Sequence, residues 1–138
     1  MMLMEYQLTE NWKISLPDGF QRRKEGAHGI FWTPGLTMIT TVFHYEGESE
    51  RQALLENLRD KALTAGHKTI EDTEDDEFLQ RFGYLQMEEI QPGHTRLVLH
   101  AFTLAPQSCL QTSFYVDRPE DFDTALKTWK SAAYTPSD

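Results

Sequence analysis

The segment that decides the fold is SERQALLENLRDKALTAG, residues 49–66, because it separates two stretches of β-like sequence. At about 100° per residue its apolar side chains form one stripe. The stripe consists of Leu54, Leu58, Ala62 and Ala65. Leu55 lies at its edge, and Glu56, Asn57 and Asp60 face the other way. Because burial of each leucine contributes about 1.5–3 kcal/mol, the pattern predicts an amphipathic helix that lies flat against an apolar surface.

Two local signals predict where this helix begins and ends. Ser49 followed by Gln52 is typical of a capping box, in which each side chain satisfies a backbone N–H at the other position. Gly66 can adopt the positive φ that often terminates a helix. We therefore expect a helix over about residues 49–65.

Extended segments are predicted before this helix. They are residues 12–16, a piece that restarts at Phe20 and runs into a basic turn, residues 29–32, and residues 36–45. The first alternates apolar and polar side chains, which indicates a half-buried strand. The last is rich in β-branched and aromatic residues and contains no breaker, so it is the best strand of this half.

The chain after the helix also has a β-like pattern. A brief extended segment at residues 68–71 precedes longer strands at residues 82–90, 95–104 and 110–116. Pro92-Gly93 suits the middle positions of a type II turn between the first two longer strands. Residues 95–104 are nearly continuously apolar, as expected of a central strand covered on both faces. Because short turns join the longer strands, we expect an antiparallel meander.

A second helix is predicted to close the chain at about residues 118–133. Asp117 with Glu120 indicates a capping box, and Pro119 falls in the first turn. The inward face would consist of Phe122, Leu126, Trp129 and Ala133. The order of strands, helix, strands and helix predicts an α+β fold in one domain over residues 1–138.

The composition indicates a folded and acidic domain. The 138 residues include 8 Phe, 5 Tyr and 3 Trp, which argues against disorder, and the formal net charge is -9. An acidic chain disfavours DNA or RNA as a partner, because a polyanion attracts an excess of Lys and Arg. The one basic cluster, Arg22-Arg23-Lys24, is followed by Glu25, so we interpret it as a solvated turn.

Cysteine content and the N-terminal sequence bear on location. The start, MMLMEYQLTENWK, has no basic region and no apolar run longer than four residues, so it predicts neither a secretory signal nor membrane insertion. Cys109 is the only cysteine, which excludes an intramolecular disulfide and fits a reducing compartment. We therefore expect a cytoplasmic protein.

A Leu-Pro-Asp-Gly-aromatic segment at Leu16–Phe20 precedes the amphipathic helix, the meander and a C-terminal helix that carries Trp129. This layout resembles the PsbP/DcrB-like superfamily over about residues 12–134. The resemblance implies an α/β/α sandwich around a mostly antiparallel six- to seven-stranded sheet, and a mostly non-enzymatic role as adaptor, chaperone or extrinsic subunit. Without a signal peptide or lipid-attachment cysteine, the chain is most similar to small cytoplasmic bacterial members, such as chaperones associated with type VI secretion effectors.

The sequence carries no motif for catalysis or cofactor binding. It lacks a P-loop, a dinucleotide-binding glycine motif, a nucleophile elbow and a zinc-protease motif. His44 and His100 fall on predicted strands and could meet across the sheet, where a histidine pair of the core or surface is favoured over a metal site. Cys109 has no adjacent histidine and is interpreted as structural. Glu88 and Glu89 point to opposite faces of a strand. We predict no catalytic residue, cofactor or metal.

Two features could bind a protein partner. An acidic run places five carboxylates within six residues: Asp72, Glu74, Asp75, Asp76 and Glu77. A solvated loop is one interpretation of this run, and a docking patch for a basic partner is the other, because clustered charge steers association. The second feature is Phe31-Trp32, since adjacent aromatic side chains on an extended segment cannot both face one core. Core packing is the alternative for that pair.

The first functional hypothesis is therefore a non-enzymatic adaptor or chaperone that holds a protein partner on a sheet face or on the acidic loop. The lack of catalytic motifs and the family resemblance support it. The alternative is a small-ligand-binding domain or unrecognised enzyme with a pocket between the sheet and a helix. Homodimer formation stays open, because a meander can expose an edge or a face.

Overall fold

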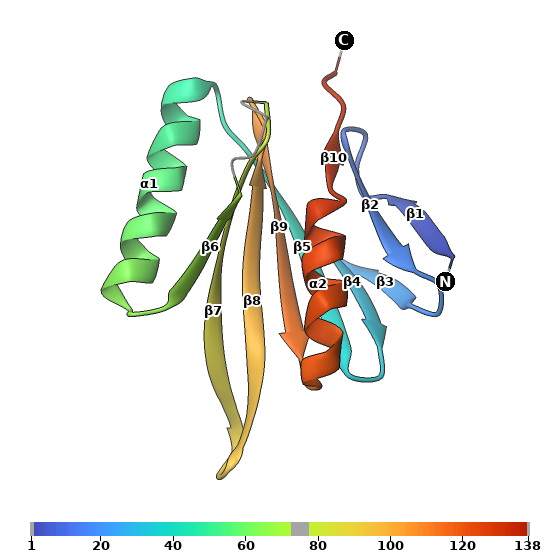
Figure 1. Ribbon diagram of the computed structural model, residues 1–138. Coiled ribbons are helices and arrows are strands. Elements are labelled where there is room, and N and C mark those ends of the chain that lie inside the picture. The colour runs from blue at the N-terminus through green and yellow to red at the C-terminus, as the bar shows by residue number, and fades with distance from the viewer. Residues whose placement is uncertain (1, 73–77, 138) are drawn as a thin grey trace.

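The computed structural model describes residues 2–72 and 78–137, which form two antiparallel sheets and two α-helices (Figure 1). The larger sheet has seven strands. In order across the sheet they are β3 (Gln21–Glu25), β4 (His28–Thr33), β5 (Leu36–His44), β9 (Ser108–Val116), β8 (His94–Leu104), β7 (Gln80–Gln91) and β6 (Lys68–Asp72). The smaller sheet comprises β1 (Leu3–Gln7), β2 (Trp12–Pro17) and β10 (Ala133–Tyr134), with β2 in the middle. The predicted α+β fold with a mostly antiparallel sheet is confirmed.

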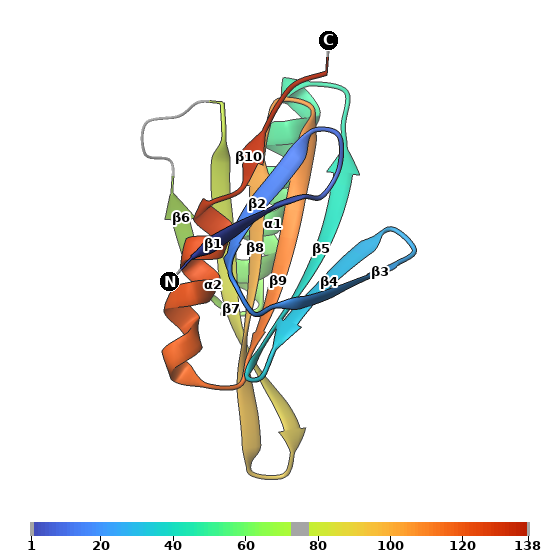
Figure 2. The same cartoon turned by 90° about the vertical axis from the view of Figure 1, so that its right-hand side faces the viewer.

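The two helices lie on opposite faces of the larger sheet. α1 (Glu48–Thr64) packs on β6 and β7, whereas α2 (Phe122–Lys130) packs on β8, β9 and β2 (Figures 1 and 2). A 3-10 helix at Pro119–Asp121 leads into α2. The smaller sheet therefore shares a layer with α2, and α1 alone forms the layer on the other side. No helix in the described part of the chain is long and apolar enough to cross a bilayer.

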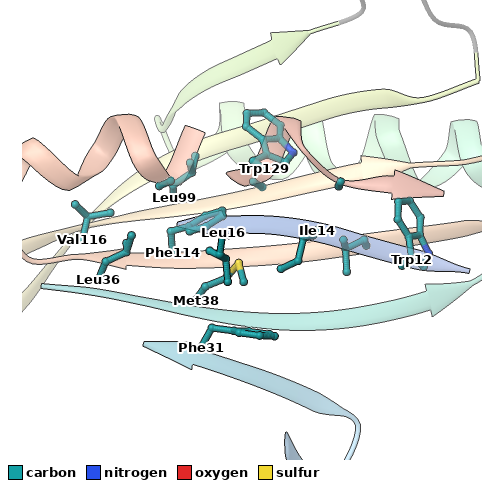
Figure 3. Close-up of a cluster of buried hydrophobic side chains, with 14 of the residues drawn as sticks. Trp12, Ile14, Leu16, Phe31, Leu36, Met38, Leu99, Phe114, Val116 and Trp129 are labelled. Carbon is teal, nitrogen blue, oxygen red and sulfur yellow. The ribbon is translucent and has the colours of Figure 1, made fainter. Parts of the chain in front are cut away.

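The main core fills the space between the larger sheet and the layer of β2 and α2 (Figure 3). Trp12, Ile14 and Leu16 are buried in it, because alternate residues of a strand share one face. Phe114 of β9 lies opposite them, and Trp129 of α2 closes the cluster. The alternating pattern of residues 12–16 thus identified β2, the strand that packs its apolar face on the larger sheet beside α2.

A smaller core lies beneath α1, on the opposite face of the larger sheet. Leu55 and Ala62 of α1 pack there with Phe82 of β7 and Phe102 of β8. The predicted contact between the amphipathic helix and an apolar surface is confirmed. Gly66, with φ 76°, follows the helix as predicted.

The inward face of α1 is rotated relative to the prediction. Leu55, expected at the edge of the stripe, is 3% exposed, whereas Ala65 is exposed. The reason is Arg51, which lies one turn before Leu55 and is also buried. Its guanidinium donates hydrogen bonds to the main-chain carbonyls of Leu104 (2.7 Å) and Phe78 (2.9 Å). A charged residue in the inward row is not detected by a pattern of apolar side chains.

The start of α1 also differs from the prediction. The helix begins at Glu48 without a side-chain cap hydrogen bond, so the predicted capping box of Ser49 and Gln52 is wrong. Instead, the Glu50 carboxylate accepts a hydrogen bond from the main-chain N–H of Glu46 at 2.7 Å. The helix therefore starts one residue earlier than predicted, and the hydrogen bond near its start is accepted by the Glu50 carboxylate and not by the Ser49 hydroxyl.

The closing helix is shorter than predicted. α2 ends at Lys130, because the chain then turns to add β10 to the edge of β2, and residues 131–133 are therefore not helical. The capping box predicted from Asp117 and Glu120 is wrong, since neither the 3-10 helix nor α2 has a side-chain cap hydrogen bond. Pro119 does occupy the first turn, as predicted.

The β7–β8 and β3–β4 hairpins of the larger sheet test two of the strand and turn predictions. β7, β8 and β9 form the predicted meander, with Gly93 at φ 78° in the turn between β7 and β8. At the other end, the basic cluster Arg22-Arg23-Lys24 lies on β3 rather than in a turn, so that interpretation is wrong. The turn follows at Gly26 (φ 58°). All five residues of β3 are exposed, and the cluster is solvated as expected.

Candidate functional site

The predicted acidic docking patch is attached to β6, an edge strand of the larger sheet. Asp72 is the last residue of β6 and pairs in register with Arg81 of β7. The other predicted contacts, Glu74, Asp75, Asp76 and Glu77, lie outside the described residues. The patch stays a prediction.

The aromatic pair on β4 is divided between the two faces of the larger sheet. Phe31 is 3% exposed and belongs to the main core, where its ring meets Tyr6 edge to face at 5.2 Å. Trp32 points to the opposite face and is half-buried. The Arg23 guanidinium lies over the indole, 5.6 Å from the ring. The expectation that the two rings do not share one core is met, and Trp32 is the ring that a partner can reach.

Trp32 is part of a cross-strand row on the face that carries α1. Register places Trp32 opposite Thr37 of β5, and Thr37 opposite Tyr115 of β9, so the three side chains share a face. Tyr115 is half-buried, and the Arg96 guanidinium lies 4.8 Å from its ring centroid. We call this the aromatic surface: Ile30, Trp32, Ile39 and Tyr115, flanked by Arg23 and Arg96.

The aromatic surface lies beside the part of the sheet that α1 covers. Its apolar members do not belong to the cluster beneath α1, which draws on β7, β8 and the start of β9. Figure 2, viewed from the α2 side, shows α1 behind the middle strands and the β3–β4 hairpin projecting beyond both helices. Both arginines are paired, Arg23 with Glu25 at 3.0 Å and Arg96 with Glu88 at 2.9 Å. The surface is therefore apolar and aromatic with neutralised charges at its rim.

A polar network separates the aromatic surface from α1. His100 Nδ1 lies 3.0 Å from Ser113 Oγ, and the Gln111 side-chain amide donates to the same oxygen at 3.2 Å. The His100 ring is 5.0 Å from the Tyr84 ring, which in turn stacks on His67 at 5.3 Å. Burial raises the pKa of Tyr84. Burial lowers the pKa of His100, and nearby His67 lowers it further, whereas Glu88 opposes the shift.

A histidine beside a serine is also the arrangement of a base and a nucleophile, but the surroundings here are those of a regular sheet. Ser113 is 6% exposed in the middle of β9. β5 and β8 pair with β9 on its two sides, so the backbone N–H groups near Ser113 bond within the ladder. They are thus not presented to a developing oxyanion. The network satisfies the polar groups of a half-buried row.

His44 and His100 do not meet, so that expectation is wrong. His44 lies at the exposed end of β5 and pairs with Ser108, whereas His100 shares its row with Ser113 and Ile39. The offset arises because β9 lies between the two histidine-bearing strands. Among residues 2–72 and 78–137, no group of three or more His, Cys, Asp and Glu could hold a metal ion.

Cys109 lies in the core beneath α1, in agreement with its interpretation as structural. The thiol is fully buried, and this burial raises its pKa to about 12. Arg51 and a backbone hydrogen bond from Thr103 partly oppose the shift. Next to it, the Tyr45 hydroxyl donates to the carbonyls of Ala105 and Ser108, and burial raises the pKa of Tyr45. A thiol in this setting is not an activated nucleophile.

A cavity of about 560 Å³ opens on the other face of the larger sheet, beneath the β3–β4 hairpin. Phe31, Val42 and Leu8 give it an apolar floor, where β4, β5 and the turn after β1 come together. Arg22 and Lys24 stand at its mouth on alternate positions of β3. Neither α1 nor α2 contributes a lining residue, so this cavity lies between a sheet and a turn and not between a sheet and a helix.

The mouth of this cavity is cationic. The Arg22 guanidinium lies over the Tyr6 ring at 5.3 Å from its centroid, which fixes it on the cavity side of β3. Within the described part of the chain, neither Arg22 nor Lys24 forms an ion pair with a carboxylate. Glu25, the acidic residue of β3, pairs with Arg23 instead. No Asp or Glu is among the described residues that line the cavity.

Sequence reasoning identified Trp32 but missed Tyr115, Arg96 and the cations of β3. The alternation of β9 does place Tyr115 on the polar side of its strand with Gln111 and Ser113. Its proximity to Trp32, however, depends on β5 pairing with both β4 and β9, which the local pattern does not show. The sequence signal for the cavity was the cluster at 22–24, once it is assigned to a strand.

Comparison with known proteins bears on the fold. No family model and no curated protein matches the chain. A crystal structure from Bacteroides thetaiotaomicron is similar, with a TM-score of 0.65 and 12% sequence identity. The similarity covers 91% of this chain and 46% of that one, so the chain spans less than half of the neighbour's length. At this identity the likeness shows a shared fold alone.

Proposed function

We propose that this chain is a non-enzymatic protein-binding adaptor or chaperone that holds a protein partner on the aromatic surface, with the acidic run at residues 72–77 as a second contact. The observation that carries the proposal is the row formed by Trp32 and Tyr115, each with an arginine over its ring. Trp, Tyr and Arg are the residue types that dominate binding hot spots.

The local geometry supports a partner that presents apolar side chains. Trp32 and Tyr115 are half-buried in the free protein, so a partner can remove the remaining ring surface from water. Arg23 and Arg96 are held by both a ring and a carboxylate, so little side-chain freedom is left to lose on binding. The proposal also agrees with the resemblance to the PsbP/DcrB-like superfamily and its small bacterial chaperones.

The test is quantitative capture with surface variants. Tagged wild-type protein, W32A and Y115A are used to capture partners from a lysate of the source organism at low salt. We expect a stoichiometric partner that both variants lose. Leu63→Ala is the matched control, because Leu63 is 68% exposed on α1, away from the aromatic surface. Unchanged capture by W32A and Y115A, or no stoichiometric partner in repeated captures, would contradict the proposal.

The contribution of the acidic run is tested separately. Neutralising Asp75, Asp76 and Glu77 as Asn or Gln should weaken capture and flatten its dependence on salt, because exposed charges are screened. Unchanged binding would remove the run from the mechanism. Sedimentation of the pure protein shows whether the partner is a second copy: a homodimer broken by W32A would identify it.

A second candidate function, small-ligand binding, is favoured by one observation. The cavity of about 560 Å³ falls within the range of about 300–1,000 Å³ that small-molecule sites occupy. It lies on the opposite face of the sheet from the aromatic surface, so the two candidate sites can be tested one at a time.

A further inference from the structure

We propose that the cavity beneath the β3–β4 hairpin binds a small amphiphilic anion, with a carboxylate or phosphate head group at Arg22 and Lys24 and an apolar body on the floor of Phe31, Val42 and Leu8. The site is distinct from the aromatic surface, and the proposal does not depend on the protein-binding function.

Positive charge is concentrated at the mouth of the cavity, although the chain as a whole is acidic. The chain carries 22 acidic and 13 basic residues, yet Arg22 and Lys24 are directed to the cavity side of β3 and no described acidic residue lines the cavity. The Arg23 guanidinium lies on the opposite face of the sheet, over Trp32. Like charges held together repel one another unless an anion lies between them. Arg23 has Glu25 as its partner, which leaves Arg22 and Lys24 as the two cations that a ligand would neutralise.

The two cations are spaced so that both side chains can reach one head group. Residues two apart on a strand lie on the same face, about 7 Å from each other. Register confirms this placement, because Arg22 pairs with Phe31 and Lys24 pairs with Gly29 on the cavity side of β4. Two long side chains at this spacing can converge on one head group, and the planar guanidinium suits the paired oxygens of a carboxylate or phosphate.

The floor of the cavity offers an apolar surface to a ligand. Beneath Lys24, the Thr40 side chain packs against the bare backbone of Gly29, since a Cβ at Gly29 would lie 2.6 Å from the Thr40 hydroxyl oxygen. Both residues line the cavity. Phe31 and Val42 continue this floor towards Leu8, so an apolar body would displace water from an apolar surface while its head group stays at the mouth. A fully ionic ligand would gain nothing from this floor, and a fully apolar one would leave the cations unpaired.

Octanoate, octyl phosphate and the neutral octanol are the probes, titrated into the full chain by calorimetry at low salt. Backbone amide NMR shifts of Gly26 and Gly29 locate the site. We expect at least one of the two anions to bind the wild-type protein. The double variant R22Q/K24Q should bind it at least about tenfold more weakly, which is the loss typical of charge-assisted hydrogen bonds. Lys61→Gln removes one charge from α1, away from the cavity, and should leave the affinity unchanged.

A preference for octanoate or for octyl phosphate supports the proposal and assigns the head group. Failure of both anions to bind, equal affinity for octanol, or an equal loss in Lys61→Gln overturns it. Trp32→Ala and Tyr115→Ala should leave octanoate binding unchanged, because they lie on the opposite face of the sheet. Loss of partner capture and loss of anion binding are therefore separable.

Discussion

His100 Nδ1 lies 3.0 Å from Ser113 Oγ, a contact that joins β8 to β9 on the face of the sheet that carries α1. Tyr84 covers the imidazole from the neighbouring strand, at 5.0 Å between ring centroids. Burial and the nearby His67 lower the pKa of His100 below its usual value, and Glu88 only partly opposes them. The row therefore favours a neutral imidazole between a hydroxyl and an aromatic ring.

This relationship predicts a histidine that resists protonation. In a ¹H–¹⁵N NMR titration, the His100 midpoint should lie below the usual value of about 6.5. Because the unfolded chain takes up this proton first, the contribution of His100 to stability is complete above about pH 6.5 and is lost as the pH falls through the lower folded pKa. His100→Gln should flatten this part of the stability profile, measured by urea unfolding. A midpoint at or above 6.5 would contradict the assignment.

Cys109 predicts a loss of stability on the alkaline side. Its thiol has a pKa of about 12 when folded and 9.0 as the unperturbed value, so the unfolded chain releases the proton first. Stability should be unaffected below about pH 9 and should fall as the pH rises towards 12. Urea unfolding at several alkaline pH values should show a shallower fall for Cys109→Ala.

The same burial should protect the thiol from alkylation. Native protein at neutral pH should react with iodoacetamide far more slowly than protein unfolded in urea, which serves as the control. Rapid native alkylation would show that the chain beneath α1 opens easily, or that the thiolate is accessible.

Arg51 predicts that one charged residue of α1 is essential to the fold. Arg51→Met removes the donors for the Leu104 and Phe78 carbonyls and should lower the free energy of unfolding by about 3 kcal/mol. Arg59→Met is the control, because Arg59 pairs with Glu71 in a half-exposed ion pair that contributes about 0–1 kcal/mol. Similar losses in the two variants would contradict the structural role of Arg51.

Arg51 also illustrates why some helix and strand features could not be predicted from the sequence: they depend on segments that are distant along the chain. Periodicity located the strand at residues 36–45 within one residue of β5, because its β-branched residues and the flanking glycines are local signals. β1 has no such signal, since four of its five residues are exposed and it depends on β2 for pairing. The inward arginine of α1 likewise acquires its partners from segments far along the chain.

The candidate sites show the same limit. Phe31 and Trp32 were separable from sequence because adjacent strand residues must point to opposite faces. Tyr115 joins Trp32 only through the register of β5 with both neighbours, which is a property of the whole sheet. The cations of β3 face a cavity because the β3–β4 hairpin extends beyond the layer formed by the smaller sheet and α2. No local sequence pattern indicates where that layer ends.

Position 83, beneath α2, has no room for a side chain larger than that of glycine. A Cβ at Gly83 would lie 3.0 Å from the outer edge of the Trp129 indole and 3.3 Å from the His100 carbonyl oxygen. The indole is fully buried, and its N–H donates to the Phe102 carbonyl at 3.2 Å, so the ring has little room to move. Gly83→Ala should therefore lower the free energy of unfolding by about 1–3 kcal/mol in urea titrations.

The control for this prediction is Gly47→Ala, because no atom lies within 4 Å of a Cβ at Gly47. That variant should lose less than about 1 kcal/mol, the cost of replacing a glycine at a helix N-cap. Combining Gly83→Ala with Trp129→Phe tests the cause directly, since the smaller ring makes room for the methyl group. The double variant should lose less than the sum of the single variants, and strict additivity would show that the indole is not what excludes a side chain at position 83.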